Sequence, residues 1–407
     1  MLISVPINNS APVTVNLFQR EFMKLLFISD FSESFTNKIL KGIVNYSMEN
    51  GLWSICRMPA YYKKTIGIEG VLRWAKEWGT DAIIGTFEET DDLSILKNEG
   101  IAVVAQDYKK KFRNVPNITA DYIGTGRMAA RYYIERGFHN FGFFGLNDVC
   151  WSDERCEGFR KEIQEADPGA SFFEYNLQDI NHVWFYEAEK LSEWLKSLPK
   201  PIGIMTCDDN QGNLLIEACH SAGIKTPAEV SIIGVDNDEL LCNLGVTTLS
   251  SISINIEEGG YRTAQMIEDM VRNPDDRHED IVLKPIKIVE RISTASVATT
   301  DKEIQKAVMF IYNNRHKKIS VNDIVSEVAL SRRLLEVRFK KVTGQSIYQY
   351  ISGLKIKLFA DMLLDTDEQV INIALSLGEN DAKSISKRFK TIYGCSPNEY
   401  RSRHSKK

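Results

Sequence analysis

The sequence predicts a two-lobed α/β domain with doubly wound parallel sheets, followed by an all-α domain with a tandem helix-turn-helix. Between residues 24 and about 294, short apolar runs alternate with helical patterns, which is typical of parallel strands joined by helices. The last hundred residues carry only helical patterns, and they contain an internal repeat. Basic residues are concentrated in that last part of the chain.

Six apolar runs in the first part predict buried strands, and three longer patterns between them predict helices. The strands are expected at residues 24–30, 82–85, 102–105, 141–145, 202–206 and 230–235, and the helices at 35–50, 124–136 and 211–222. In such sheets ligands lie at the carboxyl ends of the strands. Polar clusters follow the predicted strands at residues 30–35, 151–155, 207–209 and 236–238.

The repeat relates residues 331–350 to residues 381–400. Six identities share one register: Arg338/Arg388, Phe339/Phe389, Lys340/Lys390, Gly344/Gly394, Ser346/Ser396 and Tyr350/Tyr400. A short apolar helix precedes each copy, so each unit is expected to be helix, turn and basic helix, at about 319–344 and 369–394. A connecting helix is expected at 347–364. This tandem arrangement predicts binding to a double-stranded DNA operator.

Charge supports this division of the chain. Residues 297–407 contain 20 Lys and Arg against 12 Asp and Glu, whereas the whole chain of 407 residues has a net charge of -5. A basic domain on an acidic body suits a protein that contacts phosphates with one end only. By charge alone, a solvated basic surface is an equal alternative, and the repeat favours DNA.

The seven cysteines are odd in number and show no Cys-x-x-Cys spacing, which predicts reduced thiols, no zinc site and a cytoplasmic protein. No apolar run approaches the roughly 20 residues of a membrane span, so no membrane partner is expected. The first ten residues make a poor signal peptide, because they have no basic start and Pro6 interrupts their apolar stretch. We expect residues 1–22 to be a disordered extension, with a misplaced start as the alternative.

Within each basic helix, one apolar pair is expected to face the core. Leu335 and Phe339 form this pair in the first unit, and Ile385 and Phe389 form it in the second. The outward positions that would enter the major groove are Arg332, Arg333, Glu336 and Val337, then Lys383, Ser384 and Lys387. Arg338 and Arg388 are expected to contact phosphate or other parts of the chain.

The polar clusters suit a sugar, because vicinal hydroxyls need carboxylate acceptors and cationic donors, and the ring needs an apolar surface. The alternative for each strand-end Asp is a helix cap, and Asp209 in particular would cap a helix that starts near Gln211. An enzyme with Asp208 and Asp236 as general acid and base is a further alternative. No nucleophile, phosphate loop or metal-ligand spacing accompanies these residues, so we expect no catalysis, cofactor or metal.

Several stretches resemble known families. Residues 39–43, 121–126, 155–159 and 226–236 resemble the sugar-sensing core of the lac-repressor and galactose-repressor family, which is similar to periplasmic sugar-binding proteins. Residues 302–407 resemble the AraC-type double helix-turn-helix, with its Phe-Lys, Gly, Ser-Pro and Tyr-Arg tail between Phe389 and Arg401. A sensor followed by an AraC-type domain is an uncommon order, and it resembles a family of sugar-operon activators of enteric bacteria.

The resemblance implies a two-lobed, periplasmic-binding-protein-like sensor at residues 23–295, a linker at 296–301 and the DNA-binding domain at 302–407. It implies that Arg155 and Asp236 contact sugar hydroxyls, with Asp208 and Asp121 as weaker candidates, and Phe35 and Trp151 are candidates for stacking on the sugar ring. It favours D-xylose as the effector, with another carbohydrate as the alternative. It also implies a homodimer, activation of transcription and RNA polymerase as a partner. A transport-type sugar-binding protein would have no use for the tandem basic helices.

The second helix-turn-helix departs from the AraC-type pattern. Gly378 and Glu379 stand where that family has Gly-Phe, and Ser384 replaces an aromatic residue. Losing two aromatic groups predicts a looser second unit whose part in sequence recognition is smaller.

Overall fold

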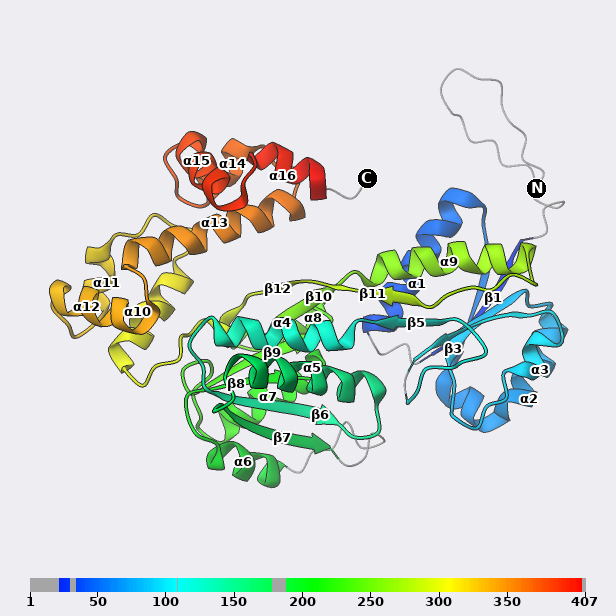
Figure 1. Cartoon of the computed structure of the whole chain (residues 1–407). Helices are drawn as coiled ribbons and strands as arrows, with labels where there is room; N and C mark the ends of the chain where they lie inside the picture. The colour runs from blue at the N-terminus through cyan, green and yellow to red at the C-terminus, as the bar shows by residue number, and fades with distance from the viewer. Residues whose placement is uncertain (1–21, 30–33, 108, 178–187, 405–407) are drawn as a thin grey trace, which may run out of the picture. The chain divides into compact units, whose positions relative to one another are not determined.

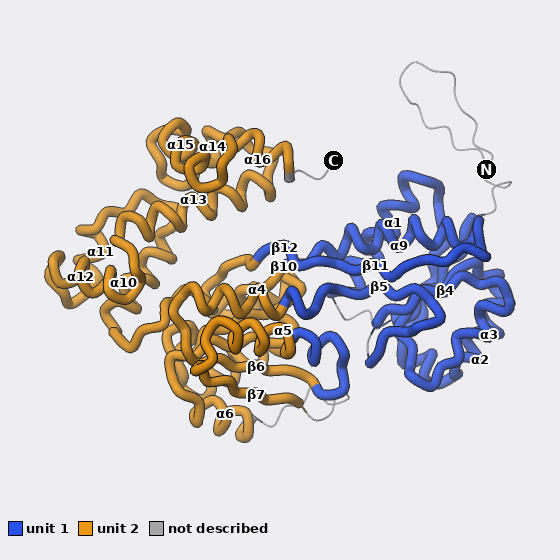
Figure 2. The backbone as a smooth tube through the Cα atoms, viewed as in Figure 1, with its two compact units in different colours: residues 1–125, 147–155, 253–287 blue, residues 126–146, 156–252, 288–407 orange. Residues whose placement is uncertain are grey.

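The computed structural model describes residues 22–29, 34–107, 109–177 and 188–404. The chain forms two compact units (Figure 2). Unit 1 contains residues 1–125, 147–155 and 253–287, and unit 2 contains residues 126–146, 156–252 and 288–407. The predicted extension lies outside the described residues, except for its last residue, and so does most of the polar cluster at 30–35.

Unit 1 is built on a six-stranded sheet in the order β11-β5-β4-β3-β1-β2, with parallel neighbours throughout. Its strands are β1 (Lys24–Ser29), β2 (Ser54–Pro59), β3 (Ala82–Thr86), β4 (Ala102–Gln106), β5 (Asn117–Ala120) and β11 (Ile281–Leu283). Its helices are α1 (Ser34–Asn50), α2 (Ala60–Trp78), α3 (Ser94–Lys97) and α9 (Ile256–Arg272).

Helices cover both faces of this sheet (Figure 1). On one face, Val71 and Ala75 of α2 and Leu96 of α3 pack on the strands in a single apolar cluster. On the other, α1 and α9 lie so close that a Cβ at Gly42 would be 1.9 Å from the carbonyl oxygen of Glu257. The strands of unit 1 are apolar on both faces of the sheet, and helices cover both of these faces.

Unit 2 contains a second six-stranded sheet, in the order β12-β10-β9-β8-β6-β7. Its strands are β6 (Asn140–Leu146), β7 (Ser171–Leu177), β8 (Ile202–Thr206), β9 (Val230–Val235), β10 (Ser250–Ile254) and β12 (Pro285–Val289). The associated helices are α4 (Tyr122–Ile134), α5 (Cys150–Ala166), α6 (Ala188–Ser197), α7 (Asp209–Ser221) and α8 (Glu239–Cys242), followed by the 3-10 helix η2 (Ile292–Thr294).

The core of this second sheet also has two sides. Leu191 of α6 and Leu215 of α7 pack against one side of the strands. On the other side Tyr133 of α4 is fully buried, and its hydroxyl donates to the carbonyl oxygens of Ile204 and Ser231 at 3.0 and 2.9 Å. Two parallel sheets, each with helices on both faces, confirm the predicted doubly wound α/β class.

The rest of unit 2 is the all-α domain. Its helices are α10 (Lys302–Asn313), α11 (Val321–Glu327), α12 (Arg332–Thr343), α13 (Ile347–Asp365), α14 (Val370–Ser376), α15 (Ala382–Tyr393) and α16 (Pro397–His404). Leu335 and Phe339 are buried in a first apolar cluster, and Ile385 and Phe389 in a second, as the repeat predicts. The long helix α13 contributes side chains to both clusters and so joins the two helix-turn-helix units.

Among the described residues, no helix combines the length and the apolar character that crossing a membrane requires. All seven cysteines lie within the described ranges and are free thiols. The predicted linker is partly buried, since Ser296 and Val297 are 6% and 5% exposed.

Candidate functional site

In unit 1, polar side chains meet at the carboxyl ends of β4 and β5. Asp107 follows β4, is 4% exposed, and accepts hydrogen bonds from the hydroxyls of Thr119 at 2.5 Å and Tyr122 at 2.8 Å. Burial raises the pKa of Asp107 to about 6, although both hydrogen bonds lower it. A buried carboxylate at a strand end, partly satisfied by hydroxyl groups, is the kind of group that binds polar ligands in parallel α/β folds.

Arg155 lies beside this cluster, in the second turn of α5, and is 2% exposed. Its guanidinium carbon is 5.1 Å from the ring centre of Tyr122 and 5.3 Å from that of Trp151, so it interacts with both π-systems. The two predicted ligand residues Arg155 and Trp151 are therefore neighbours, four positions apart on one helix. Tyr122 joins them to Asp107, which the sequence did not indicate.

The other two unit 1 candidates are at helix starts. Asp121 accepts a hydrogen bond from the backbone N–H of Gly124 at 2.8 Å, so its carboxylate caps α4. Phe35 is half-buried in the first turn of α1. Next to it in sequence, the buried hydroxyl of Thr36 lies 2.9 Å from that of Ser29 at the end of β1. Both candidates therefore lie at the carboxyl edge of the sheet.

In unit 2, the neighbouring carboxylates Asp208 and Asp209 have different surroundings. Asp208 caps α7, because its side chain accepts from the backbone N–H of Gln211 at 2.8 Å. Asp209 is 2% exposed and accepts from the Ser251 hydroxyl at 2.5 Å and the Asp238 backbone N–H at 2.7 Å. The helix cap expected at Asp209 is thus wrong by one residue, because Asp209 already lies inside the helix and points into the core.

Asp236 follows β9 in a strained turn. Its φ is +93° and that of Asn237 is +46°, a region that side chains other than glycine seldom occupy. Arg291 donates to the Asn237 side-chain oxygen at 2.9 Å and to the Leu249 carbonyl oxygen at 2.9 Å, and so holds the turn. Strain that neighbouring contacts maintain in this way is typical of ligand-binding sites. We call residues 236–237 the Asp236 turn.

The first candidate DNA-contacting helix is α12. Ser331 caps it, and Gly344 ends it with a φ of +72°. The predicted outward residues Arg332, Arg333, Glu336 and Val337 are all exposed. Arg332 forms an ion pair with Glu336 at 3.0 Å. Arg338 was expected to contact phosphate or another part of the chain, and it pairs with Asp301 of the chain at 3.3 Å.

The second candidate helix, α15, repeats this arrangement. Asp381 caps it and Gly394 ends it with a φ of +74°. Lys383, Ser384 and Lys387 are exposed on the side away from the buried pair. Basic and hydroxyl side chains on an exposed helix preceded by a short helix and turn are suited to a major groove.

Ion pairs replace the aromatic packing that the second unit lacks. Glu379 pairs with Arg388 at 2.6 Å and with Lys355 at 3.8 Å, and Lys355 donates to the Leu377 carbonyl oxygen at 2.6 Å. Both Glu379 and Lys355 have side chains that are less than one-sixth exposed. Phe389 also stacks on Tyr393 with a ring-centre distance of 4.5 Å. These contacts supply a different means of ordering the turn.

Asp107, Tyr122 and Arg291 were missed from the sequence, and Asn237 was placed in a polar cluster without being chosen as a candidate. A signal existed for Asp107, which lies two residues after a predicted strand, as the chosen Asp208 does. Arg291 gave no such signal, because it is 54 residues from Asn237 and only the fold brings them together.

Comparisons with known proteins agree with this architecture. A model of a periplasmic binding protein-like domain matches residues 130–294, and a helix-turn-helix domain matches residues 324–403. The xylose operon regulatory protein of Haemophilus influenzae is 26% identical over 389 residues, which cover 94% of this chain and 98% of that protein. The protein of the same name from Escherichia coli is 26% identical and covers 80% of this chain and 85% of its own.

A solved structure of a xylose-binding transcription activator, xylR, has the same fold, with a TM-score of 0.59, 23% identity and coverage of 94% of this chain and 98% of that one. These relatives are regulators rather than enzymes, so the alternative of Asp208 and Asp236 as a catalytic pair is not supported. The chain is a sugar-responsive, DNA-binding transcription regulator with a periplasmic-binding-protein-like sensor followed by an AraC-type double helix-turn-helix, and it is similar along most of its length to the xylose operon regulatory proteins.

Proposed function

We propose that this regulator responds to a pentose, with D-xylose as the first effector to test, and activates genes for its use. The observation that carries the proposal is similarity to xylose operon regulatory proteins along 94% of the chain, sensor and DNA-binding domain together. Another carbohydrate remains the second candidate, because a solved regulator with the same sensor fold is described as a cellobiose complex. The effector is therefore decided by binding measurements.

We further propose which groups contact the sugar. Arg155 donates to hydroxyl oxygens, and Asp236 and Asp208 accept from hydroxyl groups. Asp208 and Asp121 have weaker parts, since each of their carboxylates already caps a helix. Trp151 and Phe35 supply apolar surface to the C–H side of the ring. Asp107 and Tyr122 support this set by holding the aromatic surface beside Arg155.

In the DNA-binding domain, α12 and α15 each enter a major groove of the operator. Arg332, Arg333, Lys383 and Lys387 contact guanine edges or phosphates, and Glu336, Val337 and Ser384 supplement them. The regulator works as a homodimer in the cytoplasm and recruits RNA polymerase. The domains proposed for these roles are residues 23–295 and 302–407, joined at 296–301.

The sensor proposal is tested by isothermal titration of the full chain with D-xylose, arabinose, ribose, glucose, galactose and cellobiose. We expect one pentose to bind, and Arg155→Ala and Asp236→Ala to weaken that binding at least tenfold. Arg131→Ala is the matched control, because Arg131 is an exposed arginine paired with Glu162 on the surface. Binding of cellobiose alone would replace the pentose, and binding of none of these sugars would overturn the proposal.

A further inference from the structure

Three charged side chains meet where the sensor part of unit 2 joins the DNA-binding domain. One carboxylate oxygen of Glu290 accepts from Arg136 at 2.6 Å and from Lys357 at 2.7 Å. Arg136 follows α4 and Glu290 directly follows β12, so both belong to the sensor, whereas Lys357 lies on α13. The guanidinium of Arg136 also lies 3.5 Å from the ring centre of Tyr132. We call these three charged residues the Glu290 cluster.

Glu290, at the centre of the Glu290 cluster, is largely shielded from solvent, which strengthens its interactions. The side chain of Glu290 is 13% exposed, that of Arg136 25% and that of Lys357 41%. Burial by itself would raise the pKa of Glu290, but the two cations outweigh it and hold the pKa below its usual value. Glu290 is therefore ionised and paired at neutral pH. Removing one cation would leave the charge of Glu290 less compensated and would destabilise this contact between the sensor and α13.

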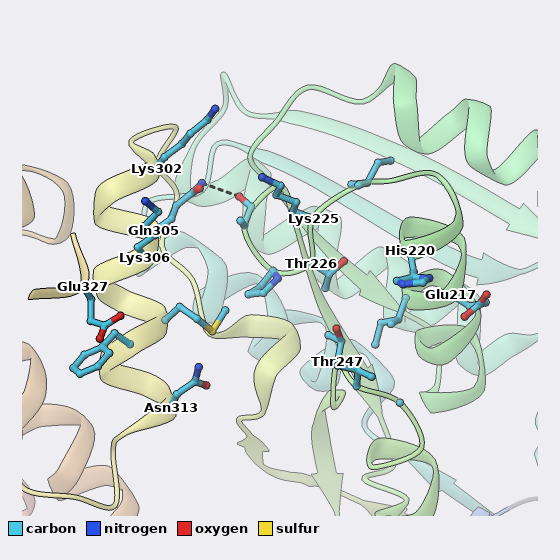
Figure 3. A pocket seen from close by; sticks show the side chains of 18 residues that line it. Glu217, His220, Lys225, Thr226, Thr247, Lys302, Gln305, Lys306, Asn313 and Glu327 are labelled. Carbon is cyan, nitrogen blue, oxygen red and sulfur yellow. Dashed lines mark hydrogen bonds between the residues drawn. The ribbon is translucent and has the colours of Figure 1, made fainter. Parts of the chain in front are cut away.

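Further hydrogen bonds fix the same junction. The Tyr312 hydroxyl of α10 donates to the backbone carbonyl oxygen of Glu290 at 3.0 Å. Gln305 of α10 donates to the carbonyl oxygen of Ala228 at 3.1 Å, beside a pocket of about 1020 Å³ that α7 and α10 line together (Figure 3). The Ala298 backbone N–H donates to the Arg136 carbonyl oxygen at 3.3 Å. The junction is thus a set of specific contacts and not a free linker.

Glu290 is also adjacent in sequence to Arg291, which contacts the Asp236 turn. Its neighbour Arg291 donates to the Asn237 side chain at 2.9 Å, and the Arg291 backbone N–H donates to the Ser250 hydroxyl at 2.7 Å. Two consecutive residues therefore face different partners. Arg291 contacts the turn that carries a candidate sugar residue, and Glu290 contacts the helix that joins the two DNA-binding units.

We propose that Glu290 and Arg291 form the segment that couples occupancy of the Asp236 turn to the position of α13. This inference rests on the proposed function, since it requires a sugar at Asp236. Sugar binding shifts the turn, Arg291 follows its hydrogen bond to Asn237, and the displaced Glu290 changes its ion pair with Lys357. Because α13 contributes to both helix-turn-helix cores, a change at Lys357 reaches α12 and α15 together. Lys357 is a positioning residue and does not itself contact DNA or sugar.

The test compares the full chain with Lys357→Met, Lys357→Arg and Lys306→Met. Lys306 is the matched control, because it is a lysine of the same domain, 58% exposed, and pairs within its own helix with Glu303 at 3.0 Å. The probe DNA is a duplex that the wild-type chain selects from a random pool. Its affinity is measured by fluorescence anisotropy with and without D-xylose, or with whichever sugar of the panel binds. The affinity of each variant for that sugar is measured by titration.

We expect the sugar to change operator affinity of the wild type by at least about fivefold. In Lys357→Met this factor falls below about 2, whereas Lys357→Arg and Lys306→Met keep it. Sugar affinity measured without DNA stays within about twofold in all four proteins. An unchanged factor in Lys357→Met, with sugar still bound, overturns the coupling and leaves the proposed function intact. If no sugar binds the wild type, the proposed function and the coupling inference both fall.

Hydrogen exchange adds a measurement that needs no operator. In the wild type we expect the sugar to alter amide exchange both at the Asp236 turn and along α13. In Lys357→Met the change at the turn remains and the change along α13 is lost. Loss at both places would show a defect in sugar binding, and a retained change along α13 would contradict the role assigned to Lys357.

Discussion

Asp209 shows how one position along the chain decides the chemistry of a carboxylate. Asp208 is half-buried and caps the helix, whereas Asp209 is turned into the protein. Burial and, to a smaller extent, the nearby charge of Asp236 raise the pKa of Asp209 to about 8, although the hydrogen bonds from Ser251 and the Asp238 backbone lower it. Asp209 therefore binds a proton in the folded chain at pH values where it is ionised in the unfolded chain.

Because this folded-state pKa is raised, the contribution of Asp209 to stability is present below about pH 4 and is lost as the pH rises to about 8. Asp209→Asn removes that loss, since an amide can accept from the Asp238 N–H and donate to the Ser251 oxygen. One pKa unit corresponds to about 1.4 kcal/mol. Between pH 5 and 8.5 we therefore expect the free energy of unfolding to fall by at least about 1.4 kcal/mol more in the wild type than in the variant. Urea unfolding across this range, with Asp381→Asn at an exposed helix cap as the control, would show parallel curves if Asp209 were ionised throughout.

At the scale of elements, the closest helix pair in unit 1 depends on two glycines. A Cβ at Gly260 of α9 would lie 2.1 Å from the Ile39 carbonyl oxygen, and one at Gly42 would meet the backbone of α9. Backbone atoms cannot turn aside as a side chain can. The helices would have to separate, and the apolar residues between them would lose contacts.

We expect Gly260→Ala to lower the free energy of unfolding by about 1–3 kcal/mol through overpacking. Gly353→Ala is the matched control, because Gly353 lies within α13 and a Cβ there meets no atom within 4 Å. The control should gain about 0.5–1 kcal/mol from the better helix propensity of alanine. Thermal and denaturant unfolding measure the free energy of unfolding of both variants. If both substitutions changed this free energy in the same direction, the close approach of α1 and α9 would be contradicted.

The sequence predicted the buried apolar pair of each helix-turn-helix unit, because each pair recurs with helical spacing. The predicted looseness of the second unit followed from two missing aromatic groups. Its ordering by Glu379, Lys355 and Arg388 was not predictable, since these residues come from separate helices and turns and only the fold brings their charges together.

At the scale of the whole molecule, charge is divided between a sensor that repels DNA and a domain that binds it. The residues of the DNA-binding part carry an excess of basic side chains, and the rest of the chain carries an excess of acidic ones. Affinity for an operator should therefore depend steeply on salt, because bound cations are released from the phosphates. The slope reports how many phosphates the two helices neutralise.

We expect Lys383→Ala to reduce the magnitude of that slope by about 1 if Lys383 contacts a phosphate, with a similar loss of affinity for every DNA sequence. Arg333→Ala should instead relax discrimination at one base pair, at a cost of about 1–3 kcal/mol, if it reads a guanine. Anisotropy titrations at several salt concentrations measure both. Lys41→Ala, in α1 and paired with Glu257, is the control and should alter neither quantity.

The domain organisation of the chain was easier to predict from the sequence than the residues of the candidate sugar-binding site were. Alternating apolar runs and the internal repeat indicated two kinds of domain without any knowledge of contacts. The candidate effector residues were chosen by their place after strands. This could not distinguish the capping Asp208 from the buried Asp209, and it could not find the contact of Arg291 with Asn237. Those distinctions depend on which strands are neighbours and on the direction each side chain takes, and both are properties of the folded chain.

The order of the chain has a consequence during translation. Each parallel sheet receives its last strand only at β11 or β12, near residue 289, and every helix of the DNA-binding domain comes later. A ribosome that stops early thus releases a product with an incomplete sensor and no operator-binding helices. Such a product lacks the helices that bind an operator. Incomplete synthesis therefore lowers the amount of regulator, but it does not produce a protein that binds DNA without a complete sensor.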